Sequence, residues 1–167
     1  EGTDVNSAII NVQPDGSVLI ETGIHENGQG SESAMILLVS QELGLPPERI
    51  RYRLPSTANI PDGGTTVASR GTIMGGGATV NACKILKDMI MDAMKQIRGL
   101  DVTGFGEQNL LDAGGKVLIS WNEAIKLCFN NQIYPHAFGV YKAPRVDWDE
   151  DTGQGNAYFT WVYGCQA

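Results

Sequence analysis

The first part of the chain contains two short stretches in which apolar and polar residues alternate, as they do in half-buried β-strands. These stretches cover residues 7–12 and 17–22, and a Pro-Asp-Gly turn at 14–16 lies between them. Such a turn between two alternating runs is a strong signal for a β-hairpin. The second stretch leads directly into a glycine-rich segment at 23–30. The sequence therefore predicts a hairpin followed by a loop.

Two longer segments carry apolar residues three or four positions apart, which is typical of helices packed on a core. The first covers 31–43, and Ser31 or Ser33 is expected to cap its start. The second covers 72–98. Small residues at 75–78 would let another backbone lie very close to the start of this second helix.

The rest of the pattern predicts short strands, one further helix and a loop. A capping box at Ser120-Trp121-Asn122-Glu123 opens a helix that runs through residue 129. Strands are expected at 49–54, 116–119, 137–141 and 158–163, and the acidic segment 147–155 is expected to be a loop. The element order indicates an α+β fold, a two-layer sandwich with helices 31–43 and 72–98 packed on a mixed β-sheet that includes the hairpin.

The charge of the chain excludes some partners. The formal net charge is −7 and the pI is about 4.7, so nucleic acid and anionic membranes are not attracted. No apolar stretch approaches the roughly 18 residues that span a bilayer, and no charged-then-apolar leader opens the chain. We therefore expect neither a nucleic-acid nor a membrane partner.

The cysteines indicate the redox compartment, and the chain ends indicate that the domain is longer than this sequence. Cys83, Cys128 and Cys165 are far apart in apolar surroundings, which favours buried free thiols in a reducing, cytoplasmic compartment. The chain begins at Glu1 rather than Met and stops within an aromatic run. We expect residues 1–167 to be part of a longer domain, truncated at both ends.

Two glycine loops carry the candidate chemistry. Gly28-Gln29-Gly30 lies between a strand and a helix, where unpaired backbone N–H groups and the positive end of the helix dipole are expected to point outward, toward a polar or anionic group. The Gln amide offers a donor and an acceptor to a heterocycle, with room on both sides. A plain turn between a strand and a helix explains the motif equally well.

The second loop covers Val67-Ala68-Ser69-Arg70-Gly71-Thr72, again at a helix start. Small side chains, two hydroxyls and one Arg suit a phosphate-bearing ligand held mostly by backbone amides. The alternative is an ordinary helix start capped by Thr66 or Ser69, with Arg70 solvated. Two such loops in a short chain indicate a single anionic ligand.

These loops belong to a longer set of matching residues, which comprises Gly28-Gln29-Gly30, Glu42-Leu43-Gly44-Leu45-Pro46, Ile50, Pro61, Thr66-Val67-Ala68-Ser69-Arg70, Gly75 and Ala78. The set resembles the molybdenum-binding large subunit of the xanthine dehydrogenase and aldehyde oxidoreductase family. The segment 153–164 also resembles a strand late in that domain, and the similarity covers nearly the whole chain.

The resemblance implies a molybdopterin cofactor, in bacterial members often as the cytosine dinucleotide, and a parent enzyme that hydroxylates aldehydes or N-heterocycles with oxygen from water. It implies iron–sulfur clusters, and in some members FAD, on other domains or subunits, which become partners together with the remaining segments of the molybdenum subunit. By the same resemblance the cofactor contacts are Asn27, Gly28, Gln29, Val67, Ala68, Ser69, Arg70, Gly71 and Thr72.

The family's glutamate base, its Gly-Phe-Gly-Gly loop and its iron–sulfur ligands find no match here. We therefore expect no catalytic or metal-ligating residue, and an isolated chain that is inactive and free of cofactor. Two other hypotheses compete: a folded α+β module without affinity for cofactor, and an ordinary nucleotide site. The second lacks any phosphate-loop motif. His25 and His136 have no metal-ligand spacing, and Glu26 is expected to be structural.

Overall fold

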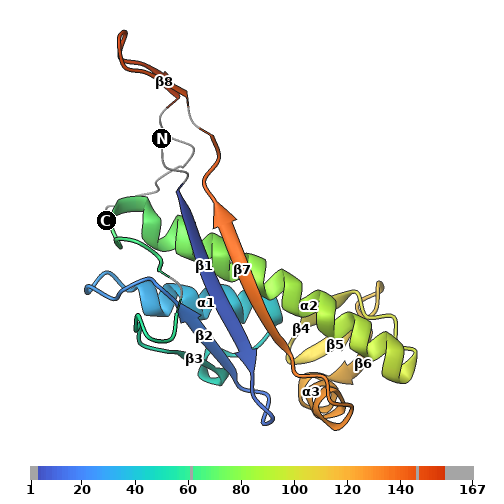
Figure 1. Ribbon diagram of the computed structural model, residues 1–167. Coiled ribbons are helices and arrows are strands. Elements are labelled where there is room, and N and C mark those ends of the chain that lie inside the picture. Colours follow the sequence, from blue (N-terminus) through green and yellow to red (C-terminus); the bar gives the residue numbers. More distant parts are fainter. Residues whose placement is uncertain (1–3, 61, 146, 157–167) are drawn as a thin grey trace, which may run out of the picture.

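A four-stranded sheet forms the centre of the molecule, in a computed structural model that describes residues 4–60, 62–145 and 147–156. Its strand order is β3-β2-β1-β7 (Figure 1). The strands β1 (Val5–Val12) and β2 (Val18–Thr22) are antiparallel neighbours. The predicted hairpin is confirmed, because Gly16 takes a positive φ of 82° in the turn and the Asp15 carboxylate accepts from the backbone N–H of Ser17 at 2.9 Å.

The outer strand β3 makes the sheet mixed, as predicted, and β7 completes its other edge. The strand β3 (Ile50–Tyr52) runs parallel to β2, and β7 (His136–Lys142) runs antiparallel to β1 along its whole length. Both correspond to strands expected from the sequence, although β3 is shorter than the predicted 49–54. Parallel pairing of β2 and β3 brings their carboxyl ends to the same edge of the sheet.

The helices α1 (Ser31–Leu43) and α2 (Gly76–Arg98) lie together on one side of this sheet (Figure 1). Their apolar faces and the inward residues of the strands make up one core, whose fully buried members include Ile10, Ile20, Met35, Leu43, Leu86, Ile90 and Met94. The predicted two-layer α+β sandwich is therefore confirmed.

The sheet and α2 approach each other closely at Gly139 in β7. A Cβ built on Gly139 would lie 2.3 Å from the backbone nitrogen of Ala82 and 2.4 Å from the carbonyl oxygen of Ala78. No side chain fits there, so the α2 backbone rests directly on the strand. The sequence predicted a close backbone approach at 75–78, and the structure places it at Ala78 and Ala82.

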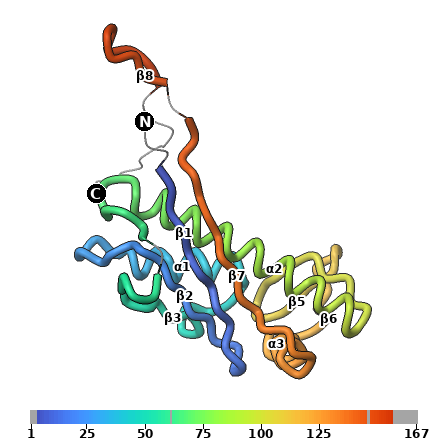
Figure 2. The backbone as a smooth tube through the Cα atoms, in the orientation of Figure 1, coloured from blue at the N-terminus to red at the C-terminus, as the bar shows by residue number. Residues whose placement is uncertain are grey.

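A smaller antiparallel sheet lies beside the carboxyl-terminal half of α2 (Figure 2). It consists of β4 (Gly104–Gly106), β5 (Asn109–Leu111) and β6 (Val117–Ser120), and only β6 was expected. The turn between β4 and β5 holds Glu107 at φ 48° and Gln108 at φ 62°. Two-residue hairpin turns with positive φ usually contain Gly or Asn, so Glu-Gln gives no recognisable turn signal.

The third helix, α3 (Trp121–Asn130), begins as the capping box predicted. The Ser120 hydroxyl oxygen accepts from the backbone N–H of Glu123 at 3.3 Å. The first helical residue, Trp121, is almost fully buried, and its indole Nε1 donates to the Gly16 carbonyl at 2.8 Å. This bond attaches the small sheet and α3 to the β1–β2 turn.

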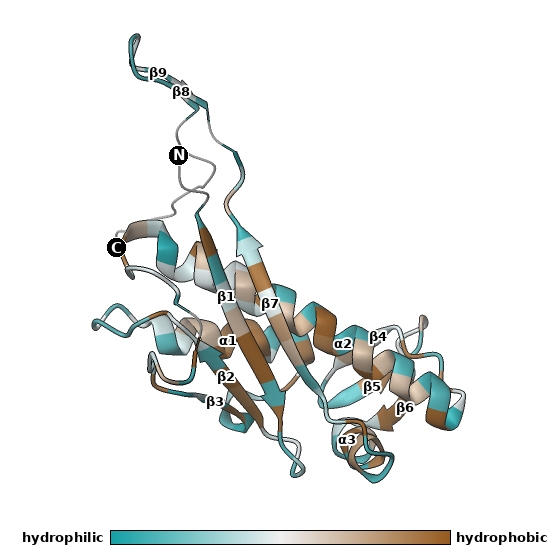
Figure 3. Cartoon of the chain, in the orientation of Figure 1, coloured by the Kyte–Doolittle hydropathy of each residue, from teal (hydrophilic) through white to brown (hydrophobic). Residues whose placement is uncertain are grey.

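The loop predicted at 147–155 is wrong in part. Strands β8 (Asp147–Asp149) and β9 (Gln154–Asn156) form a short hairpin that extends from the main body and is mostly hydrophilic (Figure 3). The Asp149 carboxylate accepts from the backbone N–H groups of Asp151 and Thr152, which closes the turn despite the acidic sequence. The strand predicted at 158–163 lies outside the described residues.

The two cysteines that the structure describes are free and buried, as predicted. Burial raises the pKa of the Cys83 thiol to about 12 and that of Cys128 to about 11. Cys165 lies outside the described residues. Within the described ranges, no helix has both the length and the apolar character that crossing a bilayer requires.

We predict that Gly139→Ala destabilises the fold by about 3 kcal/mol or more, since an inserted methyl group in a close-packed interior forces the backbones apart. Thermal or urea unfolding measures the effect. Gly104→Ala is the control, because a Cβ there meets only Leu111 side-chain atoms at 3.5 Å or more. Equal stability of the two variants would contradict the proposed backbone contact.

Candidate functional site

The first predicted loop, 23–30, follows β2 and leads into α1, in the expected order of strand, loop and helix. Gly28 and Gly30 have φ values of 94° and 82°, a conformation that side chains rarely adopt. A Cβ at either position would meet no other atom within 4 Å. Both glycines are therefore required by the backbone, and the space beside them is open.

The start of α1 differs from the prediction that Ser31 or Ser33 caps it. Gly30 is the capping residue, and no side chain at that position bonds the helix. Instead the Glu26 carboxylate accepts from three backbone N–H groups, those of Gly28 at 2.8 Å, Gly30 at 3.0 Å and Glu32 at 3.0 Å. These bonds, above all the one from Glu32, lower the pKa of the Glu26 carboxyl.

Glu26 therefore holds the loop backbone, in line with the structural role expected from the sequence, but its bonding partners were not predicted. The donors lie two, four and six residues after Glu26, and this spacing matches no standard capping motif. The sequence pattern therefore did not indicate that Glu26 caps the helix. The prediction that the N–H groups of this loop point outward unpaired is wrong for Gly28 and Gly30.

The Gln29 side chain crosses its own loop. Its Nε2 donates to the His25 carbonyl at 2.9 Å and to the Ser31 hydroxyl at 2.7 Å. Its Oε1 accepts from the backbone N–H of Asn27 at 2.5 Å. Both ends of the amide therefore hold the loop in shape, with one acceptor position of Oε1 left beyond these bonds.

The second predicted loop has an irregular backbone. Ala68 takes φ 47°, which is strained for a residue with a side chain, and residues Ala68–Arg70 form a 3₁₀ turn. A π-helical turn, Gly71–Gly75, follows before α2 begins at Gly76 rather than at the predicted residue 72. Strained residues and π-turns are frequent at functional sites.

The side chains of this loop are mostly exposed. Val67 is 56% exposed, and Ala68, Ser69 and Thr72 also face solvent, whereas Gly71 is buried. Neither Thr66 nor Ser69 caps the helix that follows. The Thr66 hydroxyl instead accepts from the backbone N–H of His25, at 2.9 Å. The alternative of an ordinary capped helix start is therefore not what the structure contains.

Arg70 is not solvated. Its Nε donates to the Thr65 carbonyl at 3.0 Å and its Nη2 to the Gly63 carbonyl at 2.5 Å, while Nη1 forms an ion pair with the Asp4 carboxylate. The guanidinium therefore joins three segments of the chain through all three of its nitrogens.

The two loops lie side by side at one end of the molecule (Figure 2). Ile24 in the first loop is fully buried, and its Cγ1 lies 2.3 Å from the position of a Cβ built on Gly75. The Tyr52 hydroxyl donates to the Ile24 carbonyl, and burial, with the nearby carboxylates of Glu32 and Glu26, raises the pKa of Tyr52 to about 12. The absence of a side chain at Gly75 therefore lets the first loop pack, through Ile24, against the segment that follows the second loop.

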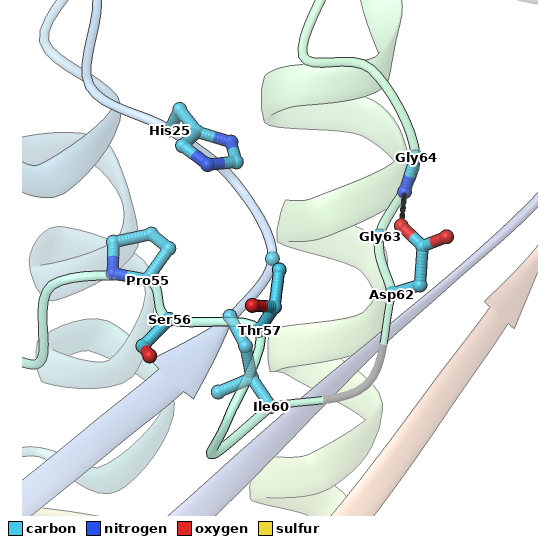
Figure 4. A pocket seen from close by; sticks show the side chains of 9 residues that line it. His25, Pro55, Ser56, Thr57, Ile60, Asp62, Gly63 and Gly64 are labelled. Atoms are coloured by element: carbon cyan, nitrogen blue, oxygen red, sulfur yellow. Dashed lines mark hydrogen bonds between the residues drawn. The ribbon is translucent and has the colours of Figure 1, made fainter.

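A hollow opens beside the first loop, at the edge where β2 and β3 end. It is lined by Gly23, His25, Pro55, Ser56, Thr57, Ile60, Asp62, Gly63 and Gly64 (Figure 4). The Asp62 carboxylate accepts from the backbone N–H of Gly64 at 2.8 Å. Within the described part of the chain, no three His, Cys, Asp or Glu side chains gather as a metal site requires.

Known proteins are similar to this chain in sequence and in fold. The family described as the molybdopterin cofactor-binding domain matches residues 1–167. The chain is 30% identical over 158 residues to aldehyde oxidase 4 of Mus musculus, and 31% identical over 157 residues to xanthine dehydrogenase/oxidase of Gallus gallus. These matches cover 95% and 94% of the chain, and the chain spans only 10% of either relative.

Solved structures show the same fold. CO dehydrogenase from Oligotropha carboxidovorans matches with a TM-score of 0.68 at 25% identity, over 82% of this chain and 18% of that one. Quinoline 2-oxidoreductase from Pseudomonas putida 86 matches with a TM-score of 0.71 over 90% of this chain and 22% of that one, and at 19% identity it shows the fold alone.

The fold, the paired loops and these relatives define the class of protein, a domain of the molybdenum hydroxylases, whose members here are oxidoreductases. Within that class, the chain belongs to the molybdopterin cofactor-binding domain family.

We predict that Gly75→Ala lowers stability by about 1–3 kcal/mol, the usual cost of overpacking, because its methyl group would collide with Ile24. In the Ile24→Ala background the same change should cost little, since the colliding Cγ1 is gone. A double-mutant cycle of unfolding free energies tests this. Additive losses would mean that the two loops are not in contact at this point.

Proposed function

We propose that this chain is the molybdopterin-binding part of a longer molybdenum hydroxylase that oxidises aldehydes or N-heterocycles with oxygen derived from water. The proposal includes truncation at both ends, and its support is that the chain spans about a tenth of its curated relatives. Iron–sulfur clusters, FAD and the cytosine dinucleotide form of the cofactor are proposed on the resemblance to the family. The buried thiols of Cys83 and Cys128 favour a reducing, cytoplasmic location.

The main support for a cofactor site is that two open glycine loops lie together at one end of the fold. The contact of Ile24 with Gly75 and the bond from the His25 N–H to the Thr66 hydroxyl support a single site rather than two. We assign the contacts to Asn27, Gly28, Gln29, Val67, Ala68, Ser69, Gly71 and Thr72, and Arg70 belongs to the same loop.

The residues fit a phosphate-bearing pterin. A Cβ on Gly71 would meet only the Ser31 hydroxyl, at 3.7 Å, so the glycine is not needed for packing within this chain. Exposed Ser69 and Thr72 offer neutral donors beside it. An acidic chain can hold an anion by such hydroxyl and amide groups without a surplus of cationic side chains.

The chemistry divides between cofactor and protein. When bound, the molybdenum centre supplies the redox chemistry, while the protein binds and orients the cofactor. In this chain, Gln29 holds the first loop by three bonds and leaves an acceptor for the pterin. The small residues of the second loop let a phosphate approach the backbone. The base of the reaction and the substrate contacts belong to other segments.

We predict that Gly71→Val in the full-length protein lowers bound molybdenum by about tenfold or more, the factor for losing one charge-assisted hydrogen bond. The reason is that the Val side chain would fill the space assigned to the phosphate, where a Cβ meets only the Ser31 hydroxyl, at 3.7 Å. Molybdenum per polypeptide and the melting temperature of cofactor-free protein are the measurements.

Gly104→Val, distant from both loops, is the matched control and should retain the metal. Wild-type molybdenum content in Gly71→Val would remove the second loop from the cofactor site, whatever its effect on turnover.

The second candidate is a folded module that has no activity or cofactor affinity by itself. It is favoured by the internal pairing of the loop groups, because Glu26, Gln29 and Arg70 already bond within the chain. Both proposals hold if one describes the parent protein and the other the isolated chain.

We predict that purified residues 1–167 neither retain molybdopterin nor hydroxylate aldehydes or purines, since the chain contains no matching base and only part of the cofactor site. Assays with an artificial electron acceptor, alongside the full-length protein as positive control, test this. Measurable turnover by the isolated chain would refute it.

A further inference from the structure

The Arg70 side chain is bonded to other groups of this chain, whereas an arginine that binds phosphate directs its N–H groups at the ligand. Its three nitrogens are bonded to the Asp4 carboxylate and to the carbonyl oxygens of Gly63 and Thr65. The side chain is 24% exposed, and that of Asp4 is 36% exposed. Three of the five guanidinium N–H groups are therefore used within the chain, and the positive charge is already paired with a carboxylate before any phosphate binds.

The groups that Arg70 binds connect the second loop to the base of the first loop. Asp4 directly precedes β1, and Gly63 is buried against the base of the first loop, since a Cβ on Gly63 would lie 3.0 Å from the Gly23 Cα. The Asn6 side-chain amide donates to the same Gly63 carbonyl at 3.2 Å. Arg70 thus links the second loop through Gly63 to Gly23.

A strained backbone lies immediately beside this link. Ala68, two residues before Arg70, takes φ 47°, and a residue with a side chain keeps such a conformation only when the surrounding structure over-determines it. The 3₁₀ turn of Ala68–Arg70 ends at the anchored Arg70. The anchor supplies the constraint that the strained turn requires.

We propose that Arg70 is a positioning residue, which fixes the 67–72 loop by bonding to Asp4, Gly63 and Thr65, and that it makes no contact with the cofactor phosphate. The proposal rests on the proposed function, because the loop it positions is the one assigned to the cofactor. It distinguishes Arg70 from its neighbours Ser69 and Gly71, which offer their own groups to the ligand.

Asp4→Asn in the full-length enzyme separates the two roles by the sign of its effect. If Arg70 positions the loop, removing the Asp4 charge loosens the anchor, and molybdenum retained after dialysis falls in the same direction as in Arg70→Ala. If Arg70 contacts the phosphate, Asp4→Asn frees the guanidinium, and retention rises or stays unchanged.

Arg70→Lys provides a second distinction. Lys is a competent point charge for phosphate but cannot reproduce the planar fork of donors. We expect Arg70→Lys to lose nearly as much molybdenum as Arg70→Ala, and the Asp4→Asn/Arg70→Ala double variant to lose no more than the worse single variant. Full retention by Arg70→Lys would overturn the proposal.

The matched control is the ion pair of Lys87 with Glu42 between α2 and α1, whose side chains are 23% and 25% exposed. Lys87→Ala should lower the melting temperature of the cofactor-free protein while molybdenum is retained. Loss of molybdenum in Lys87→Ala as well would attribute the Arg70 effect to general destabilisation and overturn the proposal. Two outcomes distinguish this proposal from the proposed function. If Gly71→Val keeps its cofactor, the proposed function fails. If Gly71→Val loses the cofactor and Asp4→Asn retains it, only the role of Arg70 is refuted.

Discussion

The contact between the α2 backbone and Gly139 is the constraint on which the arrangement of the molecule depends. Because the helix touches β7 without intervening side chains at Ala78 and Ala82, its distance from the sheet and its direction across it are fixed. The same close packing continues toward the start of α2, where a Cβ on Gly77 would lie 2.6 Å from the Tyr141 ring. One face of the helix is therefore built from residues with little or no side chain.

This constraint positions the candidate site. With α2 held against the sheet, the turn that precedes it, Gly71–Gly75, lies beside the loop that follows β2. The buried Ile24 side chain occupies the room that Gly75 leaves, and Tyr52 of β3 holds the Ile24 carbonyl. Packing among apolar and small residues thus determines the geometry of two loops whose own residues are mostly polar and exposed.

Charge pairing completes the site in a chain with a net charge of −7. The Glu26 carboxylate occupies the N–H groups at the start of α1, which reduces the positive potential of that helix end. The Asp4 carboxylate neutralises Arg70 in the second loop. In the proposed site, a neutral heterocycle would therefore suit the first loop better than a phosphate, which would rely on the exposed hydroxyls and backbone amides of the second loop.

The sequence by itself determined the elements whose signals are local. The Pro-Asp-Gly turn, the Ser120 cap and the helical spacing from residue 31 to 43 depend on neighbouring residues, so hairpin, helices and α+β class were predictable. The two glycine loops were found in the same way. Tertiary structure alone decided the partners of Arg70, because residues 66 positions apart, such as Asp4 and Arg70, meet only after α2 packs on the sheet. The β4–β5 hairpin was also beyond prediction, since Glu107 and Gln108 lack the preferences that mark such a turn and only the surrounding structure holds their positive φ.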